Sequence, residues 1–118
     1  MKAIFFLGTC STCQRILNDW APIPTNMLLQ EIKSTPMTAY QVDAMKELAG
    51  SYEALFSRRA MKFRSMGLGD HTLTEKDYRK LIIEEYTFLK RPVLVFENEI
   101  FIGSAKKTIV AANARLHV

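Results

Sequence analysis

The sequence is poor in cysteine: two among 118 residues, both within four positions, as Cys10-Ser-Thr-Cys13. Two cysteines are too few for the multiple disulfides that hold small secreted domains together, so that class is excluded. Long apolar runs are also missing, and no stretch approaches the roughly 18 residues of a membrane span. The apolar start at residues 3–7 is too short for the core of a signal peptide. We therefore expect a cytoplasmic protein, in which a close cysteine pair indicates redox or metal chemistry rather than structural bridging.

Charge of one sign is not in large excess either. Sixteen basic residues stand against 12 acidic ones, which leaves a net charge of +4. This mild bias permits an acidic protein, an oxyanion or a nucleic acid as partner and selects none of them. The hydrophobic share of 48% and the charged share of 24% are typical of a globular chain. Repeats and low-complexity tracts are absent, and the length fits a single domain over residues 1–118.

The front of the chain alternates strand, helix and strand. The apolar, β-prone residues 2–7 predict a buried strand, and residues 26–32 predict a second one. Between them we expect a helix over about residues 11–20, capped by Ser11 or Thr12. A strand–helix–strand unit of this kind favours a parallel pair of strands.

The middle of the chain has the periodicity of helices. A capping box, with Thr38 as the cap and Gln41 reaching back, starts the first of them. Residues 52–66 continue the helical pattern in one or two pieces, and another helix starts after Thr74. We expect these helices, over about residues 36–87, to form an insertion between the second strand and the end of the chain.

The pattern returns to β-structure near the end. Residues 93–96 and 100–102 are β-branched and aromatic, and the three residues between them, 97–99, have the length of a hairpin turn. A final helix fits residues 105–116. This order predicts an α/β fold with a small mixed four-stranded sheet flanked by helices, as in a thioredoxin-like arrangement. Its core is expected over about residues 1–35 and 88–118.

The CxxC carries the strongest chemical signal in the sequence. Cys10 ends the loop after the first strand, and Cys13 lies in the first helical turn on the same side. The exposed amides and the dipole of a helix N-terminus favour a thiolate, so Cys10 is the predicted nucleophile. Cys13 would then resolve a mixed disulfide or a sulfenic acid on Cys10. The alternatives are two small buried hydrophobic side chains, or a zinc site, which His71 and His117 do not complete because their spacing is wrong.

Arginines extend this candidate site. Arg91-Pro92 precedes a predicted strand, where a thioredoxin-like fold has a cis proline beside the reactive cysteine, although the sequence does not give the isomer. Residues 58–64 include four basic side chains, among them Arg58 and Arg59, and no acid. Such a cluster attracts oxyanions, acidic protein surfaces or nucleic acid. The alternative for both groups is a solvated strand edge or helix face.

Together with further motifs, these features resemble the arsenate reductase-like (ArsC/Spx) family. The resemblance covers nearly the whole chain and rests on the CxxC after the first strand, Thr35-Pro36-x-Thr38, Phe56-Ser-Arg-Arg59, Gly67-Leu68, Leu89-Lys-Arg-Pro-Val93 and Phe101-Ile-Gly103. It implies a thioredoxin-like fold with a helical insertion. One branch of the family reduces arsenate with glutathione and glutaredoxin, using one cysteine and a set of arginines. The other branch, of Spx type, senses oxidation through a CxxC and binds the C-terminal domain of the RNA polymerase α-subunit.

The resemblance assigns roles residue by residue. Cys10 matches the reactive cysteine of the family, and Cys13 matches the second cysteine of the Spx branch. Arg91 matches the arginine before the proline, and Arg59 matches a basic position of the Spx branch. The other two arsenate-binding arginines of the reductases fall on Ser57 and near Ala105. This departure from the reductase pattern weakens arsenate reduction and leaves the thiol chemistry intact, because an oxyanion needs several fixed charge-assisted donors.

We therefore expect a thiol–disulfide redox protein of arsenate reductase type, with Cys10 and Cys13 as catalytic thiols and Arg91, Arg59 and Arg58 binding the oxyanion or substrate. The alternative is an Spx-type redox-sensing regulator. No cofactor is expected beyond a thiol reductant such as glutathione or a thioredoxin or glutaredoxin system. The expected partners are that reductant, a small oxyanion or the RNA polymerase domain. Direct DNA contact, membrane binding and a metal are not expected, and we expect a monomer.

Overall fold

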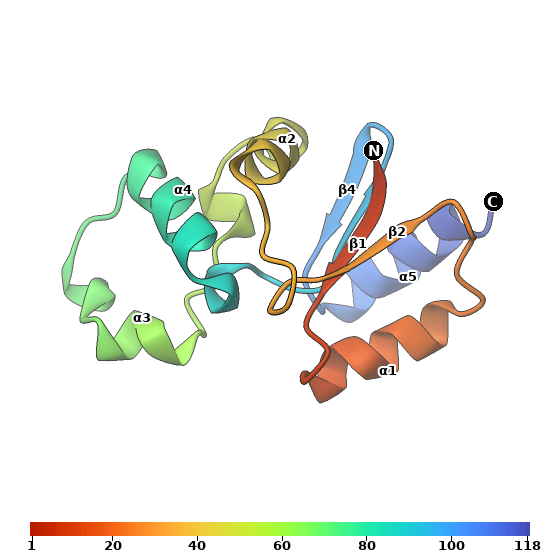
Figure 1. Cartoon of the computed structure of the whole chain (residues 1–118), viewed down its shortest axis with the longest axis horizontal. Coiled ribbons are helices and arrows are strands. Elements are labelled where there is room, and N and C mark those ends of the chain that lie inside the picture. Colours follow the sequence, from red (N-terminus) through yellow and green to blue (C-terminus); the bar gives the residue numbers. More distant parts are fainter. The chain divides into compact units, whose positions relative to one another are not determined.

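A computed structural model describes residues 1–118 and divides them into two compact units (Figure 1). Unit 1 comprises Met1–Thr35 and Arg91–Val118, and unit 2 comprises Pro36–Lys90. Unit 1 contains β1 (Lys2–Phe6), α1 (Ser11–Trp20), β2 (Leu28–Glu31), β3 (Val93–Phe96), β4 (Glu99–Ile102) and α5 (Lys106–Leu116). Unit 2 contains α2 (Ala39–Ala49), α3 (Met61–Ser65) and α4 (Glu75–Glu84). No helix combines the length and the apolar character needed to cross a bilayer.

The strands of unit 1 form one mixed sheet in the order β2-β1-β3-β4. β1 runs parallel to β2 and antiparallel to β3, and β3 and β4 form an antiparallel hairpin. These pairings confirm the predicted strand–helix–strand unit, the hairpin and the mixed four-stranded sheet. The hairpin turn is one residue shorter than expected, because Glu99 already pairs with Phe96. Glu97 takes up the tight turn with a φ of 57°, in the left-handed region.

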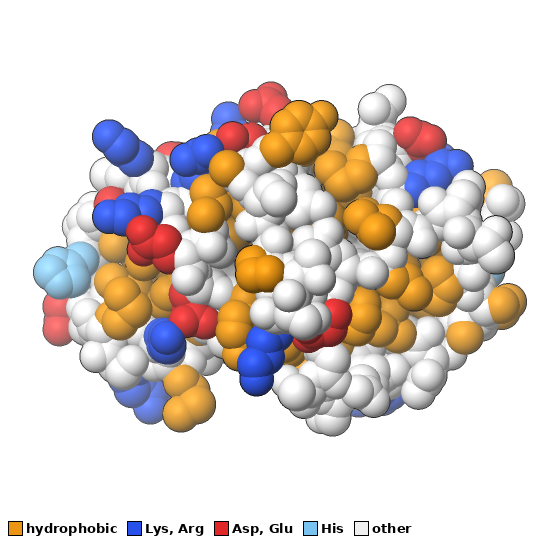
Figure 2. Space-filling view, in the orientation of Figure 1, with side chains coloured by type: hydrophobic (Ala, Val, Ile, Leu, Met, Phe, Trp, Pro, Cys, Tyr) orange, Lys and Arg blue, Asp and Glu red, His pale blue; other side chains and the backbone are white.

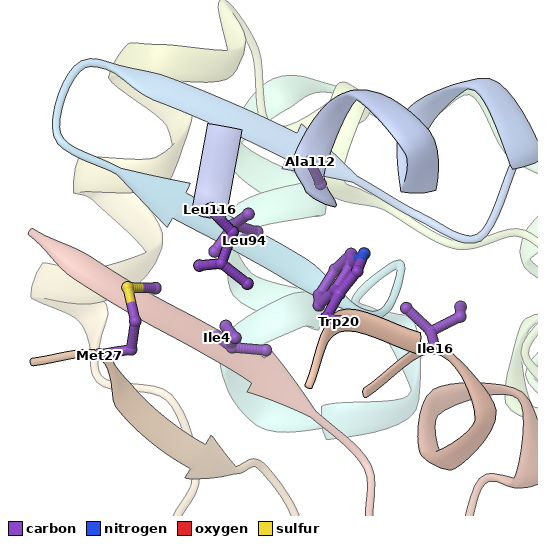
Figure 3. Packing of buried hydrophobic residues seen from close by; sticks show 7 residues of the cluster. All are labelled: Ile4, Ile16, Trp20, Met27, Leu94, Ala112 and Leu116. Atoms are coloured by element: carbon purple, nitrogen blue, oxygen red, sulfur yellow. The ribbon is translucent and has the colours of Figure 1, made fainter. Parts of the chain in front are cut away.

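Two helices, α1 and α5, bury their apolar side chains against one face of this sheet. Ile4 on β1 and Leu94 on β3 are register partners, so their side chains share a face. The cluster built on them is drawn in Figure 3 and consists of Ile4, Ile16, Trp20, Met27, Leu94, Ala112 and Leu116. Trp20 also donates a hydrogen bond from Nε1 to the carbonyl of Ile109 at 3.1 Å, which ties α1 to α5. This packing fixes α1 on the sheet and thereby places its N-terminus at the end of β1.

The helix starts of unit 2 follow the predicted capping boxes. The Thr38 hydroxyl accepts a hydrogen bond from the Gln41 amide at 3.1 Å, and the Gln41 side chain accepts one from the Thr38 amide at 3.0 Å. Thr74 and Asp77 form the same reciprocal pair at the start of α4. Each box satisfies two amides that a helix N-terminus otherwise leaves without an acceptor.

The helical pattern of residues 52–66 is divided in the structure. A short 3₁₀ helix covers Glu53–Leu55, and α3 begins only at Met61. Between them Phe56 is extended and forms an isolated antiparallel bridge with Leu89. Its ring stacks on Phe88 with the centroids 5.0 Å apart. The tertiary pairing of Phe56 therefore interrupts the helix, and the two-piece version of the prediction is the one observed.

Candidate active site

Both cysteines lie at the start of α1, where the loop that leaves β1 ends. Cys10 is the N-cap residue, with extended backbone (φ −90°, ψ 114°), and its carbonyl accepts the first helical hydrogen bond from Gln14 at 3.1 Å. No side chain caps this helix, so the expected capping by Ser11 or Thr12 is wrong. The two cysteines form no disulfide. Without a hydroxyl cap, the first-turn amides remain available to the Cys10 sulfur.

The pKa of the Cys10 thiol lies below its ordinary value. Burial of the sulfur raises this pKa, but hydrogen bonds that stabilise the thiolate outweigh it: one from the Cys13 amide, one from the Cys13 thiol and one from the Thr12 amide. The positive charge of Arg91 lowers the pKa further. Because the Cys10 side chain is also partly exposed, its thiolate can be reached by a substrate.

The second thiol has the opposite character. Cys13 is fully buried, and this burial raises its pKa to about 11, with the negative charge of Cys10 and the hydrogen bond to it acting in the same direction. A backbone hydrogen bond from Leu7 and the charge of Arg91 oppose the rise without cancelling it. At neutral pH Cys13 therefore stays protonated, and its S–H group donates a hydrogen bond to the Cys10 sulfur.

Arg91 and Pro92 join the site from the start of β3. The Arg91–Pro92 peptide bond is cis, and Pro92 is buried. Gly103, which follows β4, donates its amide to the Pro92 carbonyl at 2.9 Å and so fixes the proline at the end of the hairpin. The positive charge of Arg91 favours the thiolate form of both cysteines.

A model of the ArsC family matches residues 5–112, a range that includes both cysteines and Arg91. The chain belongs to the ArsC family. An arsenate reductase from Vibrio cholerae has a TM-score of 0.77 at 14% identity, over 94% of this chain and 96% of that one. A possible arsenate reductase from Streptococcus mutans UA159 has a TM-score of 0.68 at 27% identity, over 90% and 92% of the two chains.

The solution structure of an arsenate reductase (ArsC) related protein from Brucella melitensis has a TM-score of 0.67 at 19% identity, over 93% of this chain and 92% of that one. No curated protein matches the sequence. The agreement with these solved structures confirms the thioredoxin-like fold class and the family resemblance that the motifs indicated.

In this ArsC-family chain the other two predicted anion-binding residues belong to unit 2. Arg58 donates from Nη2 to a carboxylate oxygen of Glu53 and to the hydroxyl of Tyr78, each at 2.7 Å. Arg58, Arg59 and Arg64 line a cleft of about 890 Å³ within this unit. On the face shown in Figure 2, the Lys and Arg side chains of unit 2 are interspersed with carboxylates. Of the three predicted arginines, Arg91 is the one that shares a unit with the cysteines.

Sequence reasoning missed two side chains that hold the loop before Cys10. Glu31, at the end of β2, accepts a hydrogen bond from the Gly8 amide at 2.8 Å. Gln14, in the first turns of α1, donates a hydrogen bond to the Gly8 carbonyl. Neither residue belongs to a recognisable motif, and Glu31 lies 23 residues from Gly8, so no local sequence pattern indicated these contacts. No three His, Cys, Asp or Glu side chains come together in a way that could hold a metal ion.

Proposed function

We propose that this ArsC-family protein is a thiol–disulfide redox protein in which Cys10 attacks and Cys13 resolves. The proposal is supported above all by the placement of the two thiols at the N-terminus of α1, where Cys10 is partly exposed and Cys13 is buried, and the pKa values of the two thiols are displaced in opposite directions in keeping with it. A thiolate is the attacking species, and a protonated neighbour avoids repulsion until its own turn to attack. The division of roles follows from burial, because Cys10 is partly exposed and Cys13 is not.

Reduction of a disulfide would take two exchange steps. The Cys10 thiolate attacks one sulfur of the substrate disulfide, a mixed disulfide forms, and the other substrate sulfur leaves as a thiolate that takes a proton from water. Cys13 then gives up its proton and attacks the Cys10 sulfur, which forms the Cys10–Cys13 disulfide and releases the second substrate thiol. Two electrons have moved from the protein to the substrate. A thiol reductant, such as glutathione or a thioredoxin or glutaredoxin system, returns the pair to the dithiol.

The same thiols can reduce arsenate, the substrate class named for several similar structures. Cys10 displaces one oxygen of arsenic(V) as water and forms a sulfur–arsenic bond. Cys13 then attacks the Cys10 sulfur, the electron pair of the sulfur–arsenic bond stays on arsenic, and arsenite leaves as the disulfide forms. In this version Arg91, which shares a unit with the cysteines, binds the oxyanion beside the thiolate. Arg59 and Arg58, in unit 2, are proposed separately as binders of an anionic substrate.

Turnover with a small aromatic disulfide and with arsenate tests the enzymatic role, using glutathione with glutaredoxin or thioredoxin as the reductant. We expect Cys10→Ser to abolish turnover of both substrates. In single-turnover mixtures without added reductant, Cys13→Ser should stop at the mixed disulfide with the aromatic disulfide and at the sulfur–arsenic adduct with arsenate. Ser11→Ala, a change between the two cysteines, serves as the matched control and should retain activity. Arg91→Ala should raise the KM for arsenate more than that for the disulfide. A wild-type protein that turns over neither substrate with any of these donors is not an enzyme of this kind.

A second function rests on the same cysteine pair. An Spx-type regulator requires a second thiol that can close a disulfide with the first, and Cys13 is hydrogen-bonded to Cys10. The exposed Arg59 and Arg64 on unit 2 give such a regulator a basic surface for a protein partner. For either role we propose the cytoplasm as the compartment, since its reductants keep the pair in the dithiol form.

Binding to the purified C-terminal domain of the RNA polymerase α-subunit tests the regulatory role. The reduced protein, the oxidised protein and Cys10→Ser should be compared, and a regulator predicts different affinities for the first two. The variant cannot form the disulfide, so oxidant should leave its affinity unchanged. Absence of binding in both redox states would remove this candidate.

A further inference from the structure

A carboxylate at the end of β2 holds the loop that carries Cys10. Glu31 accepts a hydrogen bond from the Gly8 amide through Oε2 at 2.8 Å. Its other oxygen, Oε1, accepts from the amides of Lys33 at 3.1 Å and Ser34 at 2.8 Å, and it lies 2.8 Å from the Ser34 hydroxyl. One carboxylate therefore joins the turn that follows β2 to the loop that follows β1.

The same loop is held from its other side by α1. The Gln14 side-chain amide donates to the Gly8 carbonyl, and the Cys10 amide donates to the Leu7 carbonyl at 3.1 Å. Space around Gly8 is limited, because a Cβ atom there would lie 3.3 Å from Cγ of Glu31. Both polar backbone groups of Gly8 are thus fixed by side chains, two residues before the reactive sulfur.

We propose that Glu31 is a positioning residue for Cys10, which acts by fixing residues 8–10 through the Gly8 amide. The inference rests on the proposed thiol chemistry of Cys10 and deepens it. The Cys10 thiolate is stabilised by the amides of Thr12 and Cys13, and hydrogen bonds of this kind weaken steeply when the angle or the distance departs from the optimum. A loop that is no longer anchored at Gly8 lets the sulfur move relative to those amides.

Glu31 is suited to this role because it stays ionised. Hydrogen bonds from the backbone of Gly8 and Ser34, together with the Ser34 hydroxyl and the Lys33 amide, hold the pKa of its carboxyl below the usual value, although burial acts in the opposite direction. An ionised carboxylate makes hydrogen bonds about twice as strong as a neutral acceptor does. Glutamine at this position has one acceptor oxygen, so it cannot serve both Gly8 and the turn after β2.

Charge and position predict opposite effects of removing the carboxylate. If Glu31 acted on Cys10 by its negative charge alone, removal would relieve repulsion and lower the pKa of the Cys10 thiol. If Glu31 acts by position, removal weakens the hydrogen bonds to the thiolate and raises that pKa. The direction of the change therefore separates the two explanations, which a loss of activity could not do.

The test measures the rate of Cys10 alkylation by iodoacetamide against pH, with the label located by mass spectrometry. We expect Glu31→Gln to shift the profile to higher pH and to slow alkylation at neutral pH about fivefold, as for the loss of one hydrogen bond. Glu84→Gln removes the same charge from an exposed site in unit 2 and should leave the profile unchanged. An unchanged or down-shifted profile in folded Glu31→Gln overturns the inference.

Two controls keep the result interpretable. In the unaltered protein the Gly8 amide proton should follow the titration of Glu31 at acid pH in nuclear magnetic resonance spectra, so the inference stays testable even if the variant does not fold. A Gly8 amide that does not respond contradicts it. If wild-type Cys10 already titrates like a free thiol and turns over no substrate, the proposed function fails together with this inference. A reactive wild type with an unaffected Glu31→Gln variant overturns the inference alone.

Discussion

Replacement of the buried Cys13 should weaken Cys10 as a nucleophile, although Cys13 is not the attacking thiol. The Cys13 thiol donates a hydrogen bond to the Cys10 thiolate, and this bond helps to hold the pKa of Cys10 low. Cys13→Ala removes that donor and leaves the backbone amides of Thr12 and residue 13 in place. Cys13→Ser keeps a donor of nearly the same size. The comparison of the two variants therefore isolates one hydrogen bond.

The magnitude follows from the donor and its surroundings. A hydrogen bond to a charged group contributes about 1.5–3 kcal/mol, but a thiol is a weak donor and Cys10 is partly exposed, so we expect about 1 kcal/mol. That corresponds to about a fivefold slower alkylation of Cys10 at neutral pH in Cys13→Ala. The wild type and Cys13→Ser should react at similar rates. All three rates should converge at high pH, where Cys10 is fully ionised.

The assay is a pH series of alkylation rates with the modified residue identified by mass spectrometry. In the wild type, a Cys13 pKa of about 11 leaves about one Cys13 in ten thousand ionised at pH 7, so the label should fall on Cys10. The reasoning is refuted if folded Cys13→Ala reacts as fast as Cys13→Ser at neutral pH. Labelling of Cys13 at a rate comparable to that of Cys10 in the wild type would refute it as well.

Three predictions concern stability. Trp20→Phe removes the hydrogen bond from the indole to the Ile109 carbonyl, and urea denaturation should show a free energy of unfolding lower by about 1–3 kcal/mol. Thr38→Ala removes the cap of α2 at a cost of about 1 kcal/mol in the same assay, which Thr38→Ser should largely restore. Hydrogen bonding to Arg79 lowers the pKa of Asp43 from 3.8 to about 2. The ionised Asp43 therefore stabilises the folded protein fully above the unfolded-state pKa of 3.8, and this stabilisation is lost as the pH falls toward the folded-state pKa of about 2. Asp43→Asn should therefore flatten the loss of stability between about pH 4 and pH 2 in denaturation curves.

The parts of the fold that could be predicted are those whose determinants lie close together in the sequence. Thr38 and Gln41 are three residues apart, so both partners of their capping box are visible at once. The same holds for Cys10 and Cys13, whose spacing places them on one side of a helix start. The parallel and antiparallel pairings followed in turn from the order of the elements, since short connections restrict how neighbouring strands can be arranged.

The parts that could not be predicted depend on contacts between distant residues. An acid such as Glu31 at the end of a strand looks like any solvated side chain until the loop at Gly8, 23 residues away, is brought to it. Phe56 leaves the helical pattern because its pairing with Leu89 outweighs the local preference. The isomer of Pro92 was open because cis and trans prolines differ by only about 0.5–1 kcal/mol, a difference that the surrounding structure decides.

The charges around Cys10 favour a disulfide over an oxyanion as the substrate of this site. Arg91 brings one positive charge to the thiols, and a Cys10 thiolate balances it. An uncharged disulfide leaves that balance unchanged, whereas arsenate adds negative charge near a loop that already holds the carboxylate of Glu31. A bound oxyanion therefore needs cations beyond Arg91, and Arg91 is the one predicted arginine in the unit that contains the cysteines. Because disulfide exchange needs only the thiolate and the resolving thiol, we expect turnover of disulfides to exceed that of arsenate, and Arg91→Ala to widen the difference.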